Sequence, residues 1–252
     1  KKVSSDGSEY AADGNAYSGT KGSVDGSQNE HQWIDKRVLS EVVSYFEYAK
    51  KVHGDSMEIW VDCHARLSGA HAAFLVHELS GIADLIEEPL PPEDIDGLRT
   101  LKEAAASNGG PKIAGGERTA TIYDRNMIRM VTEQMVDIFQ PDIGNCGGFI
   151  SFYELSTIAA MHNVAMAPHN PNGPLSVAQG LQAIASIRNG HIFETVGNEA
   201  EEQLAQEILI NPEVVRSKNG YIELPKGPGL GVELDLKGIE NRPFQRYYQT
   251  TR

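Results

Sequence analysis

Short apolar runs recur along the middle of the chain, and an ionisable residue follows closely on each of them. The runs are Met57–Val61, Ala83–Ile86, Lys112–Ala114, Val136–Phe139, Val164–Ala167 and His191–Phe193. Runs of this length predict buried strands. The ionisable residues that follow, at intervals of 25, 30, 25, 27 and 25 residues, are Asp62, Glu87, Glu117, Asp142, His169 and Glu194. Each interval is about the length of one strand–helix–loop unit.

Apolar residues at helical spacing fill the intervals between these runs. The pattern predicts helices at Trp33–Val52, His71–Leu79, Ile95–Ala106, Ile122–Met130, Phe149–Met161 and Leu175–Ile187, with one more at Glu199–Ile208. Strands that alternate with helices indicate a parallel sheet. The fold class we expect is α/β, as a TIM-type (β/α) barrel, in which the carboxyl ends of the strands meet at the active-site mouth.

The six expected strands are fewer than the eight of a closed barrel. We therefore expect either a barrel that is incomplete at its N-terminus, with Lys1–Val3 as the remnant of a further strand, or an open sheet. Residues 1–32 are rich in Gly and Ser and predict an active-site loop or a disordered lead-in. Residues 33–217 would form the barrel domain. Residues 218–252 predict an irregular tail with one short strand.

Composition narrows the classes of partner and the compartment. The net charge of −13 makes nucleic acid an unexpected partner and weighs against anionic membranes. Two cysteines, Cys63 and Cys146, imply no disulfide framework and suit a reducing compartment. No apolar run approaches the ~20 residues of a membrane span, and no signal peptide is recognisable. We expect a cytoplasmic protein.

Carboxylates at neighbouring strand ends point to a metal site. Alternate strand residues face the same side, so Asp62 and His64 would share a face that Cys63 does not. Asp62, one of Glu87 or Glu88, and Glu117 would repel one another unless a hard cation held them. Oxygen-only ligation suits Mg²⁺. Taken one at a time, each acid is better explained as a solvated loop carboxylate, whereas the set together favours a metal site.

Asp142 and His169 follow neighbouring strands of the predicted sheet. A carboxylate beside an imidazole fixes its tautomer and raises its basicity, as a general base requires. A structural His–Asp hydrogen bond is the alternative. Glu194 comes after the last expected strand, where it would bond a substrate oxygen or lie on the surface as an ordinary acid.

Several of these stretches together resemble the enolase superfamily. They are Asp62–His64, Ile86–Pro89, Gly116–Arg118, Gln140–Asp142 with Gly147 and Gly148, and His169–Pro174. Their order and spacing are most similar to the sugar-acid dehydratases of the mandelate racemase-like branch, such as galactonate dehydratase. The resemblance implies that Asp62, Glu87 and Glu117 bind Mg²⁺ and that Asp142 and His169 form the base dyad.

The same resemblance assigns two further roles and a substrate class. It implies that Glu194 is the electrophilic partner of the substrate carboxylate and that His64 protonates the leaving hydroxyl. The substrate would be an aldonic acid, dehydrated to a 2-keto-3-deoxy acid. The alternatives are a racemase, epimerase or other lyase of the superfamily, or an inactive paralogue.

The resemblance also bears on the ends of the chain and on its assembly. We expect that the capping domain that precedes the barrel in this family is absent here, and that residues 218–252 pack back on the barrel or on a capping domain. A symmetric homo-oligomer is also expected, as is common for enzymes of this kind.

Overall fold

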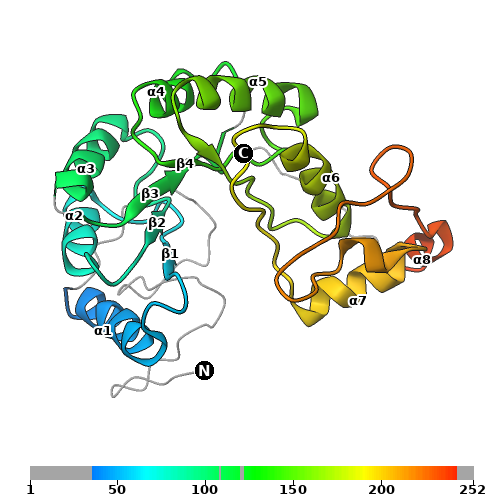
Figure 1. Ribbon diagram of the computed structural model, residues 1–252, viewed down its shortest axis with the longest axis horizontal. Coiled ribbons are helices and arrows are strands. Elements are labelled where there is room, and N and C mark those ends of the chain that lie inside the picture. Colours follow the sequence, from blue (N-terminus) through cyan, green and yellow to red (C-terminus); the bar gives the residue numbers. More distant parts are fainter. Residues whose placement is uncertain (1–35, 108, 120–121, 243–252) are drawn as a thin grey trace, which may run out of the picture. The chain divides into compact units, whose positions relative to one another are not determined.

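The computed structural model describes residues 36–107, 109–119 and 122–242 (Figure 1). The lead-in at residues 1–32, the expected strand remnant at Lys1–Val3 and the end of the tail lie outside this range. The chain divides into two compact units, which are described in turn. The first runs to Gly115 and includes Glu133–Asp137, and the second holds Gly116–Thr132 and the chain from Ile138 onward.

Three parallel strands form the sheet of the first unit. They are β1 (Trp60–Asp62), β2 (Leu85–Glu87) and β3 (Lys112–Gly115), with β2 between the other two. Val61, Ile86 and Ile113 pair across the sheet and are buried, which gives the sheet an apolar middle row. This row places the next residues of β1 and β2, Asp62 and Glu87, side by side at the carboxyl ends.

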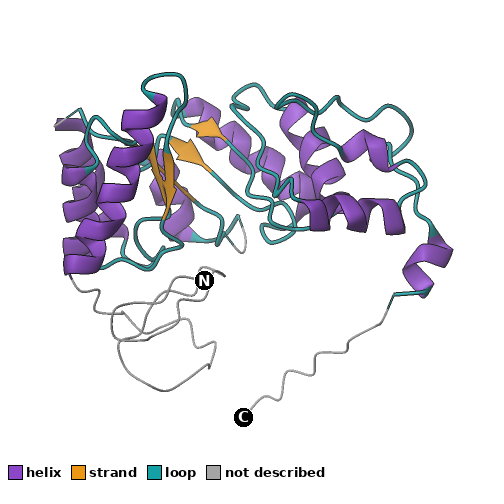
Figure 2. Ribbon diagram, turned by 90° about the horizontal axis from the view of Figure 1, so that it is seen from below, coloured by secondary structure: helices purple, strands orange, loops and turns teal. Residues whose placement is uncertain are grey.

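Helices α1 (Lys36–His53), α2 (Gly69–Glu78) and α3 (Ile95–Ser107) stand in chain order along one side of these strands (Figures 1 and 2). Leu98, Leu101 and Ala105 of α3 recur at helical spacing and are all buried. This apolar stripe is the one that the sequence pattern predicts. The helices therefore cover one face of the sheet, as a βα repeat requires.

Two aspartates fix the starts of strands in the first unit. Asp84 Oδ2 accepts a hydrogen bond of 2.8 Å from the Ile59 N–H, which lies just before β1. Asp137 Oδ2 accepts one of 2.8 Å from the Ile113 N–H in β3, and Lys102 Nζ lies 2.5 Å from the other oxygen of Asp137. In both cases the aspartate precedes the next strand along the chain, so the side chain ties one βα unit to the following one.

The second unit contains two parallel strands, β4 (Ile138–Phe139) and β5 (Ala165–Met166), in which Phe139 pairs with Met166. Its helices are α4 (Arg125–Thr132), α5 (Gly148–Met161), α6 (Pro174–Ala185), α7 (Glu199–Ile208), the 3₁₀ helix η1 (Pro212–Val215) and α8 (Leu236–Glu240). Phe139, Phe152 and Met166 are fully buried and form the centre of this unit.

One prediction about the second unit is wrong. The sixth strand expected at His191–Phe193 is absent, and just before it Gly190 forms an isolated parallel bridge with Met166. The side chain of Ile192 is 48% exposed, so this apolar run lacks the neighbouring strand that would bury it.

In the tail expected at residues 218–252, the described part forms two isolated antiparallel bridges, Leu234 with Leu209 and Lys218 with Tyr221. It also forms α8, which Asp235 caps through the N–H groups of Lys237 and Gly238.

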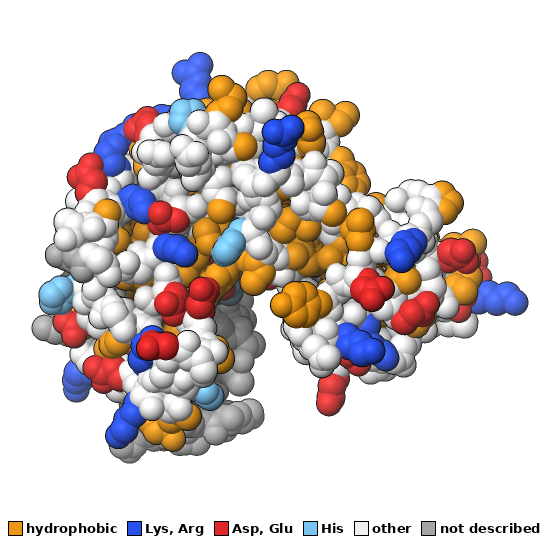
Figure 3. Space-filling model, in the orientation of Figure 1, with side chains coloured by type: hydrophobic (Ala, Val, Ile, Leu, Met, Phe, Trp, Pro, Cys, Tyr) orange, Lys and Arg blue, Asp and Glu red, His pale blue; other side chains and the backbone are white. Residues whose placement is uncertain are grey.

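The charged side chains on the surface and the short lengths of the helices both agree with the composition of the sequence. On the face shown in Figure 3, acidic and basic side chains are interspersed. Ion pairs of the described chain include Lys50 with Asp55 and Arg99 with Asp96. Among the helices of the described ranges, none has the length and apolar character needed to cross a membrane.

Candidate active site

The second unit brings Asp142 and His169 together. Asp142 follows β4 by three residues and His169 follows β5 by three residues, and these parallel strands end at the same edge. Nδ1 of His169 lies 3.2 Å from Oδ2 of Asp142. If Nδ1 carries the ring proton and donates a hydrogen bond to this carboxylate, Nε2 keeps the lone pair that a general base needs.

The Asp142 carboxylate is held on both oxygens. Oδ1 accepts hydrogen bonds from the backbone N–H groups of Gly144 at 2.8 Å and Asn145 at 3.2 Å. Oδ2 accepts one from the Asn172 side-chain amide at 3.0 Å, in addition to His169. Asp142 is only 1% exposed. An ionised carboxylate offers only acceptors, which suits four donors of this kind.

Glu117 lies on the opposite side of the His169 ring from Asp142. Its Oε2 is 3.4 Å from His169 Nε2, and its Oε1 is 3.4 Å from Arg118 Nη2. Glu117 is 8% exposed, and its buried Oε2 has no hydrogen-bond partner among the described residues. A buried carboxylate oxygen without a donor is unfavourable, so this oxygen is suited to a cation.

Glu194 forms hydrogen bonds with Asn170, the residue that follows His169. The backbone N–H of Asn170 donates to Glu194 Oε2 at 3.1 Å, and the Asn170 side-chain amide donates to the Glu194 carbonyl at 3.4 Å. Asn170 is buried. Four of the residues predicted to form the site, Glu117, Asp142, His169 and Glu194, are therefore linked in one unit, directly or through Asn170.

Sequence reasoning missed the two asparagines, Asn170 and Asn172. Both lie in the His169–Pro174 stretch that carries part of the resemblance. Their proximity to His169 was a usable signal, because short amides near a catalytic loop commonly bond its backbone and acids. Which acid each amide would reach depends on the loop conformation, which the sequence pattern does not specify.

The first unit positions Asp62, His64 and Glu87. Asp62 and Glu87 are paired in register, and the Cys63 N–H donates to the Glu87 carbonyl at 2.9 Å. His64 Nε2 lies 2.5 Å from Asp62 Oδ2, and the His64 N–H donates to Asp62 Oδ1 at 3.1 Å. The side chains of Asp62 and His64 lie close together, as expected. Because β1 ends at Asp62, this contact arises from a left-handed turn, with φ of +50° at His64.

The pair of glutamates after β2 differs in burial. Glu87 is the last residue of β2 and is partly exposed, whereas Glu88 is 2% exposed with φ of +41°. The two side chains therefore have different environments, as expected for neighbouring strand residues.

Both cysteines have raised pKa values. Burial, followed by the negative charges of Asp62 and Glu87, raises the pKa of Cys63 to about 12. Burial, followed by the charge of Asp142, raises the pKa of Cys146 to about 11. Because the thiolate is the reactive form, neither thiol is prepared as a nucleophile at neutral pH.

The predicted metal ligands divide between the units, with Asp62 and Glu87 in the first and Glu117 in the second. Over the part of the chain that the structure describes, no group of three or more His, Cys, Asp and Glu side chains is arranged to hold a metal ion. Two findings still fit a hard divalent cation. All three donors are carboxylates, and Glu117 Oε2 is buried without a hydrogen bond.

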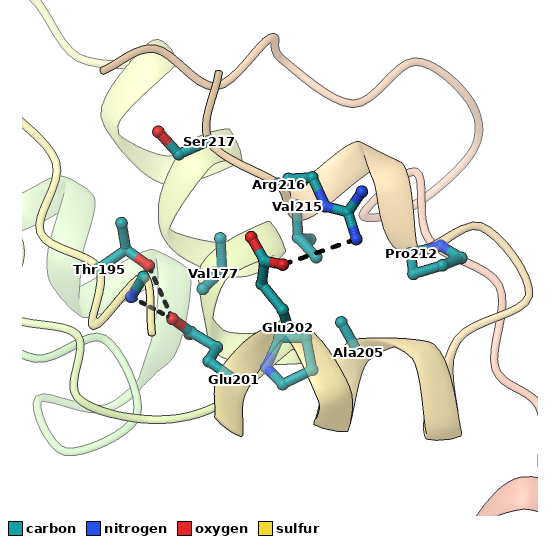
Figure 4. Close-up of a pocket in the computed structure, with 11 residues that line it drawn as sticks. Val177, Thr195, Glu201, Glu202, Ala205, Pro212, Val215, Arg216 and Ser217 are labelled. Atoms are coloured by element: carbon teal, nitrogen blue, oxygen red, sulfur yellow. Dashed lines mark hydrogen bonds and ion pairs between the residues drawn. The ribbon is translucent and has the colours of Figure 1, made fainter. Parts of the chain in front are cut away.

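A small cavity lies beside the segment that follows Glu194 (Figure 4). It has a volume of about 40 Å³, enough for water but not for a sugar acid. Glu201 accepts hydrogen bonds from the Thr195 hydroxyl at 3.2 Å and the Gly197 N–H at 2.6 Å, and Glu202 pairs with Arg216 at 3.8 Å. These contacts brace the chain just after Glu194.

Comparisons with known proteins show which proteins this chain is similar to. A family model described as enolase C-terminal domain-like matches residues 9–238. The D-galactonate dehydratase of Verminephrobacter eiseniae is 32% identical over 79% of this chain and 51% of its own length. The D-xylonate dehydratase of Haloferax volcanii is 29% identical over 80% of this chain and 47% of its own length. The chain thus spans about half the length of these curated relatives.

A solved structure shows the same fold. The mandelate racemase/muconate lactonizing enzyme-like protein from Roseovarius sp. TM1035 superposes with a TM-score of 0.72 and is 25% identical. The match covers 82% of this chain and 50% of that protein. The α/β barrel architecture predicted from the sequence is confirmed by this likeness and by the family match.

Proposed function

Because the chain belongs to the enolase C-terminal domain-like family, we propose that it catalyses the Mg²⁺-dependent dehydration of a sugar acid. The observation that carries the proposal is the 3.2 Å contact between His169 Nδ1 and Asp142 Oδ2. The names of the two dehydratase relatives support the same reaction class. The substrate would be an aldonic acid, and the product a 2-keto-3-deoxy acid.

His169 is proposed as the base that takes the C2 proton. Asp142 accepts a hydrogen bond from the Nδ1–H group of the ring, which leaves Nε2 unprotonated and directed away from Asp142. Because Asp142 is buried and held by two backbone amides, the ring keeps this orientation through the reaction. Proton transfer by a positioned base contributes about 10²- to 10⁴-fold to rate.

The metal ligands in this proposal are Asp62, Glu87 and Glu117. When bound, Mg²⁺ would supply positive charge next to the substrate carboxylate, which makes the C2 proton more acidic. Enolase-superfamily enzymes with a His or Lys base and Mg²⁺ are a standard example of this chemistry. Glu194, with a proton on its carboxyl group, is proposed to donate a hydrogen bond to the substrate carboxylate, where negative charge develops as the C2 proton leaves.

His64 is proposed as the acid that completes the elimination. The electron pair of the C2–H bond becomes the C2–C3 double bond, and the C3–O bond breaks. His64 gives its proton to the departing hydroxyl, which leaves as water. The enol that remains takes a proton at C3 and releases the proton of its C2 hydroxyl group. The product is the 2-keto-3-deoxy acid, so atoms and charge balance.

The proposal is tested by incubating the purified protein with a panel of aldonic acids, including D-galactonate and D-xylonate, in the presence of Mg²⁺. We expect a 2-keto acid from at least one of them, and no product after chelation of the metal. If no aldonic acid gives a 2-keto acid, the dehydratase assignment is wrong. Deuterium exchange at C2 without loss of water would indicate a racemase or epimerase instead.

A further inference from the structure

Asn172 contributes the fourth hydrogen bond to the Asp142 carboxylate. Its side-chain amide nitrogen lies 3.0 Å from Oδ2, the same oxygen that faces His169 Nδ1 at 3.2 Å. The other two donors, the Gly144 and Asn145 N–H groups, both reach Oδ1. The backbone therefore fixes one oxygen of the carboxylate, and side chains of the His169–Pro174 loop fix the other.

In this arrangement Asn172 restrains Oδ2, the oxygen of Asp142 that faces His169 Nδ1. With only Oδ1 anchored, the carboxylate is free to twist about its Cβ–Cγ bond and carry Oδ2 out of line with His169 Nδ1. The Asn172 amide restrains that twist from a second direction. Pro171, between the two asparagines, has a fixed φ and helps to keep His169 and Asn172 in a constant relation.

We propose that Asn172 is a positioning residue for the His169–Asp142 dyad. It holds Asp142 Oδ2 opposite Nδ1, so the imidazole keeps its proton on Nδ1 and its lone pair on Nε2. The proposal rests on the proposed function, because it assigns Asn172 a part in the action of the same base. It also makes a claim about the His169 tautomer that holds with or without turnover.

The test compares Asn172→Leu, which has the same branched arrangement of heavy atoms but no donor, with Asn172→Gln, which keeps the amide. Asn172 is exposed, so the longer Gln side chain has room. Asn241→Leu, at an exposed asparagine that follows α8, is the matched control. The measurements are kcat and KM for dehydration and the ¹⁵N NMR shifts of the His169 ring at one fixed pH.

For Asn172→Leu we expect kcat to fall roughly 10- to 100-fold with little change in KM, as is usual when a supporting partner of a catalytic group is lost. The His169 ring nitrogens should move from a single tautomer toward a mixture. Asn172→Gln should restore most of kcat and of the single His169 tautomer. Asn241→Leu should change neither kcat nor the tautomer.

Two outcomes would overturn the proposal. One is an active wild-type protein whose kcat and His169 shifts are both unchanged in Asn172→Leu. The other is a loss of activity that Asn172→Gln does not restore while the tautomer stays unchanged. A tautomer change in Asn172→Leu, in a protein whose wild type dehydrates no aldonic acid, would support the positioning role and contradict the proposed function alone.

Discussion

At Gly116 the backbone passes so close to Phe139 that no side chain fits. A Cβ at this position would lie 2.4 Å from a ring carbon of Phe139, and φ is +119°, a conformation that L-residues rarely adopt. The next residue is Glu117, whose carboxylate faces His169. The glycine thus allows the chain to turn over the buried phenyl ring and present the acid to the site.

Gly116→Ala should therefore destabilise the protein by about 3 kcal/mol, from overpacking and backbone strain together. Gly148→Ala is the control, because φ is +81° there but nothing lies within 4 Å of the added Cβ. That change should cost only about 1–2 kcal/mol of strain. Urea unfolding of both variants measures the difference. Equal losses would show that the contact with Phe139 is unimportant.

Cys146 gives a prediction about pH. Its pKa in the folded state is about 11, raised from 9.0 mainly by burial. In the unfolded chain the thiol ionises near its ordinary pKa, so the unfolded state gains from ionisation as pH rises between about 9 and 11. The contribution of Cys146 to stability is thus complete below pH 9 and is lost through that window.

The measurement is the ultraviolet absorbance of the thiolate in a Cys63→Ser variant, titrated in native buffer and in denaturant. We expect the native midpoint to lie above the denatured one. Coincident midpoints would mean that the thiol is not shielded by the fold.

At the scale of elements, the regular parts of the fold are predictable from the sequence. The helix expected at Glu199–Ile208 is α7 with the same bounds, and each of the first five apolar runs overlaps a strand. These elements are predictable because periodicity depends only on which face is buried. The run at His191–Phe193 has the same local pattern but no neighbouring strand to bury it, and the sequence pattern cannot show that difference.

The candidate site is also predictable only in part. The spacing of Asp142 and His169 indicated that they would meet, and the structure brings them within 3.2 Å. The supporting contacts of Asn170 and Asn172 were not predictable, because they depend on loop conformation. The helix α8 was also missed, although the Asp235 cap is a recognisable start signal.

Asp84 provides a test of how consecutive βα units are tied together. Asp84→Ala removes the acceptor of the Ile59 N–H and should cost about 1–2 kcal/mol. Asp84→Asn keeps a side-chain oxygen in the same place and should cost less. Hydrogen exchange at the Ile59 amide should accelerate in the alanine variant only. Unchanged exchange in that variant would show that the bond does not hold the start of β1.

At the scale of the whole molecule, the proposed function assigns Mg²⁺ to Asp62, Glu87 and Glu117. The proposed ligand set predicts that Mg²⁺ raises the melting temperature, since a ligand at 100 times its Kd stabilises by about 2.7 kcal/mol. Glu117→Gln should remove most of this effect, because it takes a charged ligand from the set. Glu154→Gln, at an exposed position of α5, should leave it intact. Equal stabilisation of both variants by Mg²⁺ would exclude Glu117 as a ligand.

The central claim is that His169, oriented by Asp142, removes the C2 proton of an aldonic acid. The most direct measurement is proton NMR of the C2 signal of each aldonic acid in D₂O with Mg²⁺, for the wild-type protein and for His169→Asn. We predict that the wild type removes the signal of its substrate while a 2-keto-3-deoxy acid appears, and that His169→Asn does neither. A C2 signal that His169→Asn removes as fast as the wild type would contradict the claim.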